Sequence, residues 1–144
     1  MMRMIYFDDI HVGDGTLFGH YDVTREEVLE FARKYDPQPF HLSDEEAAKT
    51  HFGRLAASGW HTCAMTMAVI ARHVVETEQA GLGSPGIDEL RWLKPVYPGD
   101  RLTVRGEVIE TKVITGIPSW LVTVVRVRNE PISGRERDGV FSRI

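Results

Sequence analysis

Residues 56–79 of the chain read AASGWHTCAMTMAVIARHVVETEQ, and this stretch decides the fold. Apolar residues recur through it at helical spacing, and the positions between them are mostly small or apolar as well. Charge returns only in the last turns, from Arg72 onward. The pattern predicts one long helix that is buried on most of its sides. Residues 56–59, at its start, lack bulk and let another backbone or a ligand approach closely.

The length and composition indicate an ordinary globular protein. The 144 residues suit one domain with a single core, so we expect one domain over residues 1–144. A net charge of −4 argues against a general nucleic-acid binder, which would carry a basic patch. The single cysteine, Cys63, excludes an internal disulfide and a structural zinc cluster. Neither a signal peptide nor a membrane span is recognisable, so we expect a cytoplasmic protein without a membrane partner.

The rest of the chain predicts one strand, then helices, then further strands. The first strand is expected over 17–23, and Thr24 after it has the pattern of a helix N-cap. Pro37 ends this helix, which places Asp36 where the helix turns into a loop. Ser43 begins a short second helix in the same way. After the long helix, strands are predicted over 87–96, 102–111 and 120–127, then a turn-like segment over 129–138 and at most a stub over 140–144.

One long apolar helix against one antiparallel sheet is an α+β arrangement. A single sheet wrapped around one helix leaves a strand edge and an apolar rim without cover. We therefore expect two copies of the chain to pair as a homodimer, or to form a higher homo-oligomer.

The segment 36–41, DPQPFH, places a carboxylate and an imidazole five residues apart in a loop that two prolines stiffen. An aspartate beside an apolar helix tends to have a raised pKa, and a nearby imidazole can orient a water. Asp36 and His41 could therefore activate a water molecule together. Spacing alone favours a simpler alternative, in which Asp36 caps a turn and His41 packs against the next helix.

Gly59 begins the long helix, where backbone N–H groups lack acceptors within the helix. Its N–H could donate to a carbonyl oxygen that becomes negative in a transition state, although close packing explains a glycine here equally well. His61 is more readily explained as a hydrogen-bonded core histidine than as part of a site. Arg91 and Lys94 could face phosphates or only solvent. The other histidines show no metal-ligand spacing, so we expect no metal site.

These motifs together resemble the MaoC-like dehydratase family, which contains the (R)-specific enoyl-CoA hydratases. The likeness covers roughly residues 5–112, because the loop pair, the glycine and the following apolar helix occur together and in order. The runs that carry it are YDPQPFH at 35–41, LSDEEAA at 42–48, FG at 52–53, ASGWH at 57–61, RWLKPV at 91–96 and PGDRL at 98–102.

The resemblance implies a hot-dog fold, in which a curved antiparallel sheet wraps a long central helix and two subunits pair. It implies that Asp36 and His41 are the catalytic pair and that the Gly59 amide receives the thioester oxygen. The implied reaction interconverts a 2-enoyl thioester and a 3-hydroxyacyl thioester by adding or removing water. Coenzyme A would be part of the substrate, and no separate cofactor is expected. The residues expected beside the substrate are Gln38, Pro39, Ser58 and Trp60.

The chain departs from the family pattern at three places. Gln38 stands where members usually have Asn, and Ser58 stands where many have His. The C-terminal segment 113–144 lacks the long apolar last strand of the family, so the sheet is expected to be incomplete there unless that strand comes from elsewhere.

Two other functions stay open. One is a hot-dog acyl-CoA thioesterase, although the helix offers no carboxylate before Glu76. The other is a non-catalytic subunit that binds acyl-CoA.

Overall fold

The computed structural model describes residues 3–115, 120–131 and 140–143. Within these residues, five strands make one sheet, and every hydrogen-bonded pair of strands in it is antiparallel. The strands are β1 (Gly15–Asp22), β2 (Glu89–Arg91), β3 (Arg101–Ile114), β4 (Trp120–Pro131) and β5 (Val140–Arg143). Their order across the sheet is β1-β3-β4-β5-β2, so β1 and β2 form its two edges.

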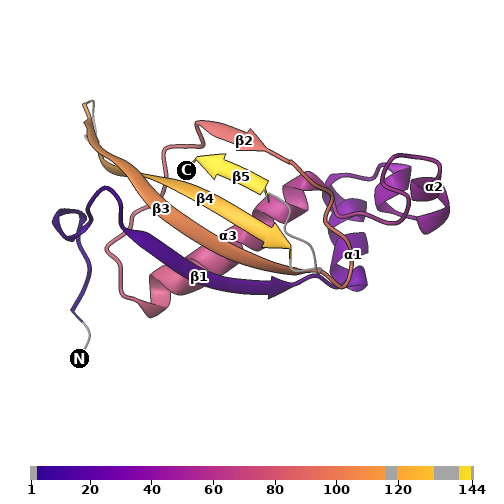
Figure 1. Ribbon diagram of the computed structural model, residues 1–144, viewed down its shortest axis with the longest axis horizontal. Helices are drawn as coiled ribbons and strands as arrows, with labels where there is room; N and C mark the ends of the chain where they lie inside the picture. The colour runs from indigo at the N-terminus through magenta and orange to yellow at the C-terminus, as the bar shows by residue number, and fades with distance from the viewer. Residues whose placement is uncertain (1–2, 116–119, 132–139, 144) are drawn as a thin grey trace.

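One long helix lies behind the sheet and crosses it obliquely, while the two shorter helices gather at one end of the molecule (Figure 1). The long helix packs against β1 and β3. The α-helices are α1 (Arg25–Tyr35), α2 (Asp44–Ala48) and α3 (Gly59–Glu76), and two short 3-10 helices are η1 (Phe7–Asp9) and η2 (Pro39–His41).

The starts of α1 and α2 follow from their cap residues. The hydroxyl of Thr24 accepts a hydrogen bond from the Glu27 N–H at 3.3 Å, and the hydroxyl of Ser43 accepts one from the Glu46 N–H at 3.4 Å. Each bond satisfies an N–H group that has no acceptor inside its helix. Both predicted helix starts are therefore confirmed.

The hydrophobic core forms where α3 meets the sheet. Met65 and Val69 on the inner face of α3 are buried, as are Leu102 and Val104 on β3. Burial of such side chains is the main favourable term for this layer packing, at about 1.5–3 kcal/mol for each large aliphatic side chain. The larger cluster of buried residues contains Val23, Val28, Leu55, Ala57, Met65, Val96 and Leu102.

The strand predictions need correction at two places. The strand expected over 87–96 is only β2, because the chain leaves the sheet after Arg91 and the Val96 carbonyl accepts a hydrogen bond from the Ala57 N–H at 2.8 Å. The stub expected over 140–144 appears as β5, a strand of four residues that pairs with both β4 and β2. The turn-like segment expected over 129–138 begins inside β4, and its residues from 132 onward lie outside the described part of the chain.

The prediction that α3 is buried on most sides is also wrong for the single chain. Trp60, Met67 and Val75 are 58%, 44% and 76% exposed. They fall on one helix face, which the sheet does not cover because a single sheet packs on one side of the helix only. Within the described residues, no helix is long and apolar enough to cross a membrane. A long helix wrapped by a curved antiparallel sheet is the hot-dog fold, so the expected α+β fold class is confirmed.

Candidate active site

Asp36 lies at the junction predicted from the sequence, as the C-cap residue of α1. Its N–H still donates to the Ala32 carbonyl at 3.0 Å, but its φ of −151° and ψ of 68° leave the helical region. Pro37 causes this exit, because a proline disfavours the helical conformation in the residue before it. The chain then enters η2, which carries His41 back toward the Asp36 carboxylate.

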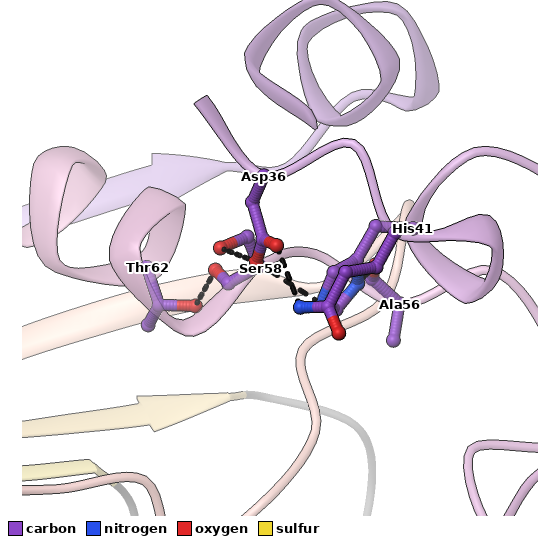
Figure 2. A network of polar contacts seen from close by, with 6 residues as sticks. Asp36, His41, Ala56, Ser58 and Thr62 are labelled. Atoms are coloured by element: carbon purple, nitrogen blue, oxygen red, sulfur yellow. Dashed lines mark hydrogen bonds and ion pairs between the residues drawn. The ribbon is translucent and has the colours of Figure 1, made fainter. Parts of the chain in front are cut away.

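Both oxygens of the Asp36 carboxylate accept hydrogen bonds from neighbouring side chains. Oδ1 accepts from the Gln38 amide at 2.6 Å, and Oδ2 accepts from the Ser58 hydroxyl at 2.7 Å. Nε2 of His41 lies 3.4 Å from Oδ2. Figure 2 shows Asp36, Ser58 and His41 converging from three segments of the chain. The expected pair, Asp36 and His41, is therefore brought together.

The His41 ring is buried, with 5% of the residue exposed, and its other nitrogen is also engaged. Nδ1 lies 2.7 Å from the Ala56 carbonyl oxygen (Figure 2). A carbonyl oxygen has no proton to give, so Nδ1 must carry the proton of this hydrogen bond. Phe40 and Phe52 surround the imidazole, with ring centroids at 4.6 Å and 5.8 Å from it.

This tautomer makes the contact between His41 and Asp36 chemically unusual. In the neutral imidazole, Nε2 is an acceptor, and it faces a carboxylate oxygen that is an acceptor too. Two acceptors at 3.4 Å need a proton donor between them or beside them. A water molecule has two O–H groups and can donate one to each acceptor, which leaves a lone pair of its oxygen free to attack.

The expected rise in the pKa of Asp36 is wrong. Burial alone would raise the pKa of this carboxyl, but the hydrogen bonds that Gln38 and Ser58 donate to it lower its pKa below the ordinary value. The carboxyl is only partly buried, so the donors outweigh desolvation. Asp36 is therefore an ionised acceptor at neutral pH.

Gly59 is the first residue of α3, and its N–H has no acceptor within the helix. The indole of Trp92 covers its α-carbon so closely that a Cβ built at position 59 would lie 2.5 Å from Cε2 of the ring. Trp60 meets Trp92 edge to face, at 5.2 Å between ring centroids. The close-packing explanation of Gly59 is therefore correct, and it is compatible with a role for the N–H.

The four residues expected beside the substrate have different surroundings. Pro39 lies in the segment that carries the pair and Trp60 follows Gly59 on α3; both are exposed and remain candidates for contact with a ligand. Gln38 is exposed but uses its amide on Asp36. Ser58 is fully buried with its hydroxyl on Asp36, so the expectation that it contacts substrate is corrected to a role behind the carboxylate.

His61 is buried as expected, but it is not the hydrogen-bonded core histidine that the sequence favoured. Its ring stacks on Phe31 at 4.7 Å, and its Nδ1 has no hydrogen-bond partner among the described residues. Burial lowers the pKa of this imidazole, and the charge of Glu27 only partly offsets that effect. His61 therefore serves the packing between α1 and α3 as a neutral ring.

Other candidate chemistries receive little support from the geometry. Burial raises the pKa of the Cys63 thiol, more than a hydrogen bond with Trp92 lowers it, so this thiol is a poor nucleophile at neutral pH. Arg91 is paired with Glu89 at 2.7 Å. In the part of the chain that the structure describes, no three His, Cys, Asp or Glu side chains gather as metal ligands would.

Sequence reasoning missed two members of the site. The carbonyl of Ala56, which fixes the His41 tautomer, has no signature in the sequence because every residue carries such a group. Trp92 was considered only as a neighbour of two charged residues, although it lies against Gly59. A glycine opposite a bulky aromatic residue is a recognisable packing signal only after the fold brings the two together.

Comparison with known proteins identifies the family of this chain. The model of the MaoC like domain family matches residues 12–129. The 3-hydroxybutyryl-CoA dehydratase of Methylorubrum extorquens is 33% identical over 111 residues, which cover 76% of this chain and 67% of that protein. The crystal structure of the MaoC-like dehydratase from Rhodospirillum rubrum has 33% identity and a TM-score of 0.73, with 96% of this chain and 94% of that chain covered.

A more distant structure shows the same fold. The (R)-hydratase from A. caviae involved in PHA biosynthesis has a TM-score of 0.71 at 21% identity, and the match covers 93% of each chain. The family match spans the site described above, from β1 through α3 to β4. The chain belongs to the MaoC-like dehydratase family, whose hot-dog fold it shares and whose members include hydratases and dehydratases.

Proposed function

We propose that this protein is a hydratase that adds water to a 2-enoyl thioester, with coenzyme A as the carrier, and that also catalyses the reverse dehydration. The observation that carries the proposal is the facing pair of acceptors, Asp36 Oδ2 and His41 Nε2, at 3.4 Å. A water molecule that donates to both has its nucleophilic lone pair turned outward.

In the first step, the water oxygen forms a bond to C3 of the substrate while Asp36 takes one of its protons. The electron pair of the C2–C3 double bond moves toward the thioester carbonyl, whose oxygen becomes negative. The Gly59 N–H at the start of α3 is the donor proposed for that oxygen. Partial positive charge at this end of an 18-residue helix favours the same anion.

In the second step, the enolate collapses and C2 takes, from the same face, the proton that Asp36 accepted from water. The net change is the addition of one water molecule, which gives a 3-hydroxyacyl thioester and restores the carboxylate. The thioester itself accepts the electron pair, so the proposed chemistry calls for no redox group or metal. The lowered pKa of Asp36 keeps this base ionised at neutral pH, and activity should fall only in acid solution, as the carboxylate is protonated.

The position of the carboxylate supports this reaction over thioester hydrolysis. Asp36 is at the end of α1, and α3 carries no carboxylate before Glu76, which is 17 positions after Gly59 at the far end of the helix. At 1.5 Å per residue the two ends of α3 are roughly 25 Å apart. A carboxylate at that distance cannot activate water against a carbonyl held at Gly59.

We also propose that the working form is a homodimer in which a second copy covers the outer face of α3. Trp60, Met67 and Val75 leave an apolar face on that helix, and such faces on globular domains are typical of interfaces between subunits. Pairing of two copies would bury that face and enclose the acyl group beside Gly59.

The Asp36→Asn variant should lower the rate of hydration by about 10²–10⁴-fold, because an amide cannot take the proton from water. Loss of enoyl thioester absorbance with short 2-enoyl-CoA substrates measures the rate, and circular dichroism checks the fold. Asp88→Asn, in an exposed loop, is the matched control and should keep the wild-type rate. Free thiol release would indicate a thioesterase instead, and binding without turnover would indicate a non-catalytic subunit.

The N–H of Gly59 can be tested apart from its packing. Trp92→Ala removes the ring that a new Cβ would strike, so Gly59→Ala and Gly59→Pro can be compared in that background. Proline is tolerated at the first position of a helix, and Ser58 already has the extended conformation (φ −56°, ψ 141°) that proline requires of the residue before it.

We expect the alanine variant to keep most of the Trp92→Ala rate, because alanine retains the N–H. The proline variant lacks it and should lose about 10²–10³-fold in kcat, the usual effect of deleting one oxyanion donor. Thermal unfolding of both proteins shows whether they fold equally well. Equal rates in the two folded variants would rule out the Gly59 N–H as the donor.

The dimer is tested by analytical ultracentrifugation. Wild-type protein should sediment as a dimer or larger at micromolar concentration, and Met67→Lys should weaken the association because it buries a charge in an apolar interface. Leu82→Lys, in an exposed loop, should leave the sedimentation unchanged. Wild-type protein that sediments as a monomer at micromolar concentrations would contradict the proposed homodimer.

A further inference from the structure

Ser58 is the N-cap residue of α3, but it does not cap its helix in the described structure. Thr24 and Ser43 hold the same position on α1 and α2, and both accept a hydrogen bond from an N–H of the first turn. The Ser58 hydroxyl is turned away from its helix and donates to Oδ2 of Asp36 at 2.7 Å (Figure 2). α3 therefore lacks the stabilising side-chain cap that a serine at this position usually provides, because the hydroxyl binds Asp36 instead.

We propose that Ser58 is a positioning residue, which selects Oδ2 of Asp36 as the atom that takes the proton from water and ties that atom to the start of α3. The proposal rests on the hydratase function proposed above.

The selection follows from the hydrogen bonds around the carboxylate. The terminal torsion of an aspartate is broad, so a carboxylate without fixed donors can exchange its two oxygens. Gln38 holds Oδ1 from the exposed side, and Ser58 holds Oδ2 from a fully buried position. Each oxygen offers two lone pairs, and the donor from Ser58 uses one on Oδ2. The other is left for the proton donor shared with His41 Nε2, 3.4 Å away.

The same residue connects the two halves of the proposed reaction. Ser58 is covalently joined to Gly59, whose N–H is the proposed donor to the thioester oxygen. The base that takes the proton from water and the donor that stabilises the enolate are therefore linked through one side chain and one peptide bond. No flexible loop separates them, so a shift of α3 moves both together. Because the hydroxyl is not a cap, the N–H groups of the first turn also stay free for the oxyanion.

The experiment compares Ser58→Ala with Ser43→Ala. In Ser58→Ala the carboxylate loses a donor, so the acid limb of the pH profile of kcat/KM should move to higher pH by about one unit, which lowers the rate on that limb about tenfold. Ser43→Ala removes a true helix cap and should lower the melting temperature without moving the limb. If the folded Ser58→Ala variant keeps the acid limb of kcat/KM at the wild-type pH, the proposal is overturned.

A second readout does not depend on activity. The carboxyl ¹³C resonance of Asp36, followed by NMR from pH 7 downward, should titrate at higher pH in Ser58→Ala than in the wild type. The same titration midpoint in both proteins would show that the Ser58 hydroxyl does not stabilise the ionised form of this carboxyl. If the alanine variant does not fold, Ser58→Cys keeps a weaker donor at similar volume and should shift the midpoint in the same direction by less.

These results separate the two proposals. A wild-type chain that hydrates no 2-enoyl-CoA would overturn the hydratase function, and this inference with it, even where the Asp36 resonance shifts. The other outcome is that the wild-type protein hydrates 2-enoyl-CoA while Ser58→Ala changes neither the titration midpoint of Asp36 nor the acid limb. In that case the hydratase function is retained and Ser58 has only a structural role.

Discussion

The hydrogen bond from His41 Nδ1 to the Ala56 carbonyl is the constraint on which the rest of the site depends. It is buried, and it leaves only one position for the proton of the neutral imidazole. Nε2 is then an acceptor beside an acceptor of Asp36, and a hydrated carboxylate–imidazole pair follows from that arrangement. If Nδ1 were exposed to water, the ring could take either tautomer, and the pair would collapse into an ordinary hydrogen bond.

The fold maintains this bond by holding two distant segments side by side. Segment 36–41 follows α1, and segment 56–58 precedes α3, with α2 between them. The Ala57 N–H bonds the Val96 carbonyl, and Leu55 on the other side of Ala56 is fully buried in the core. The backbone at Ala56 is therefore fixed from both sides. Since the carbonyl cannot move, the imidazole that donates to it cannot move either.

The sequence was sufficient to predict the parts of the fold and site that depend on local rules. The prolines after Asp36 and the apolar run from residue 59 predict the loop pair and the central helix from local conformation alone. The role of Ser58 could not be predicted, because a serine at a helix start is normally its cap, and its actual partner is 22 residues away. The predicted rise in the pKa of Asp36 was wrong for the same reason, because the fold alone brings together the donors that lower this pKa.

The C-terminal strand shows a second limit of sequence reasoning. The segment after Pro131 is short and polar, so periodicity predicts no more than a stub. Its last residues nevertheless pair with β4 on one side and β2 on the other, because an open gap in a sheet offers two rows of unpaired backbone groups. Backbone pairing of this kind depends little on side chains, which is why the sequence predicted the stub but not its two partner strands.

The most direct test of the account is hydration of a short 2-enoyl-CoA in D2O, with the configuration of the product at C2 and C3 determined by NMR. In the proposed mechanism, the attacking oxygen and the deuteron that reaches C2 arrive on the same face of the substrate, the face of Asp36 and His41. A single product of syn addition is therefore expected. Anti addition, or a mixture at C2, would mean that another group delivers the proton and would contradict the single-face mechanism.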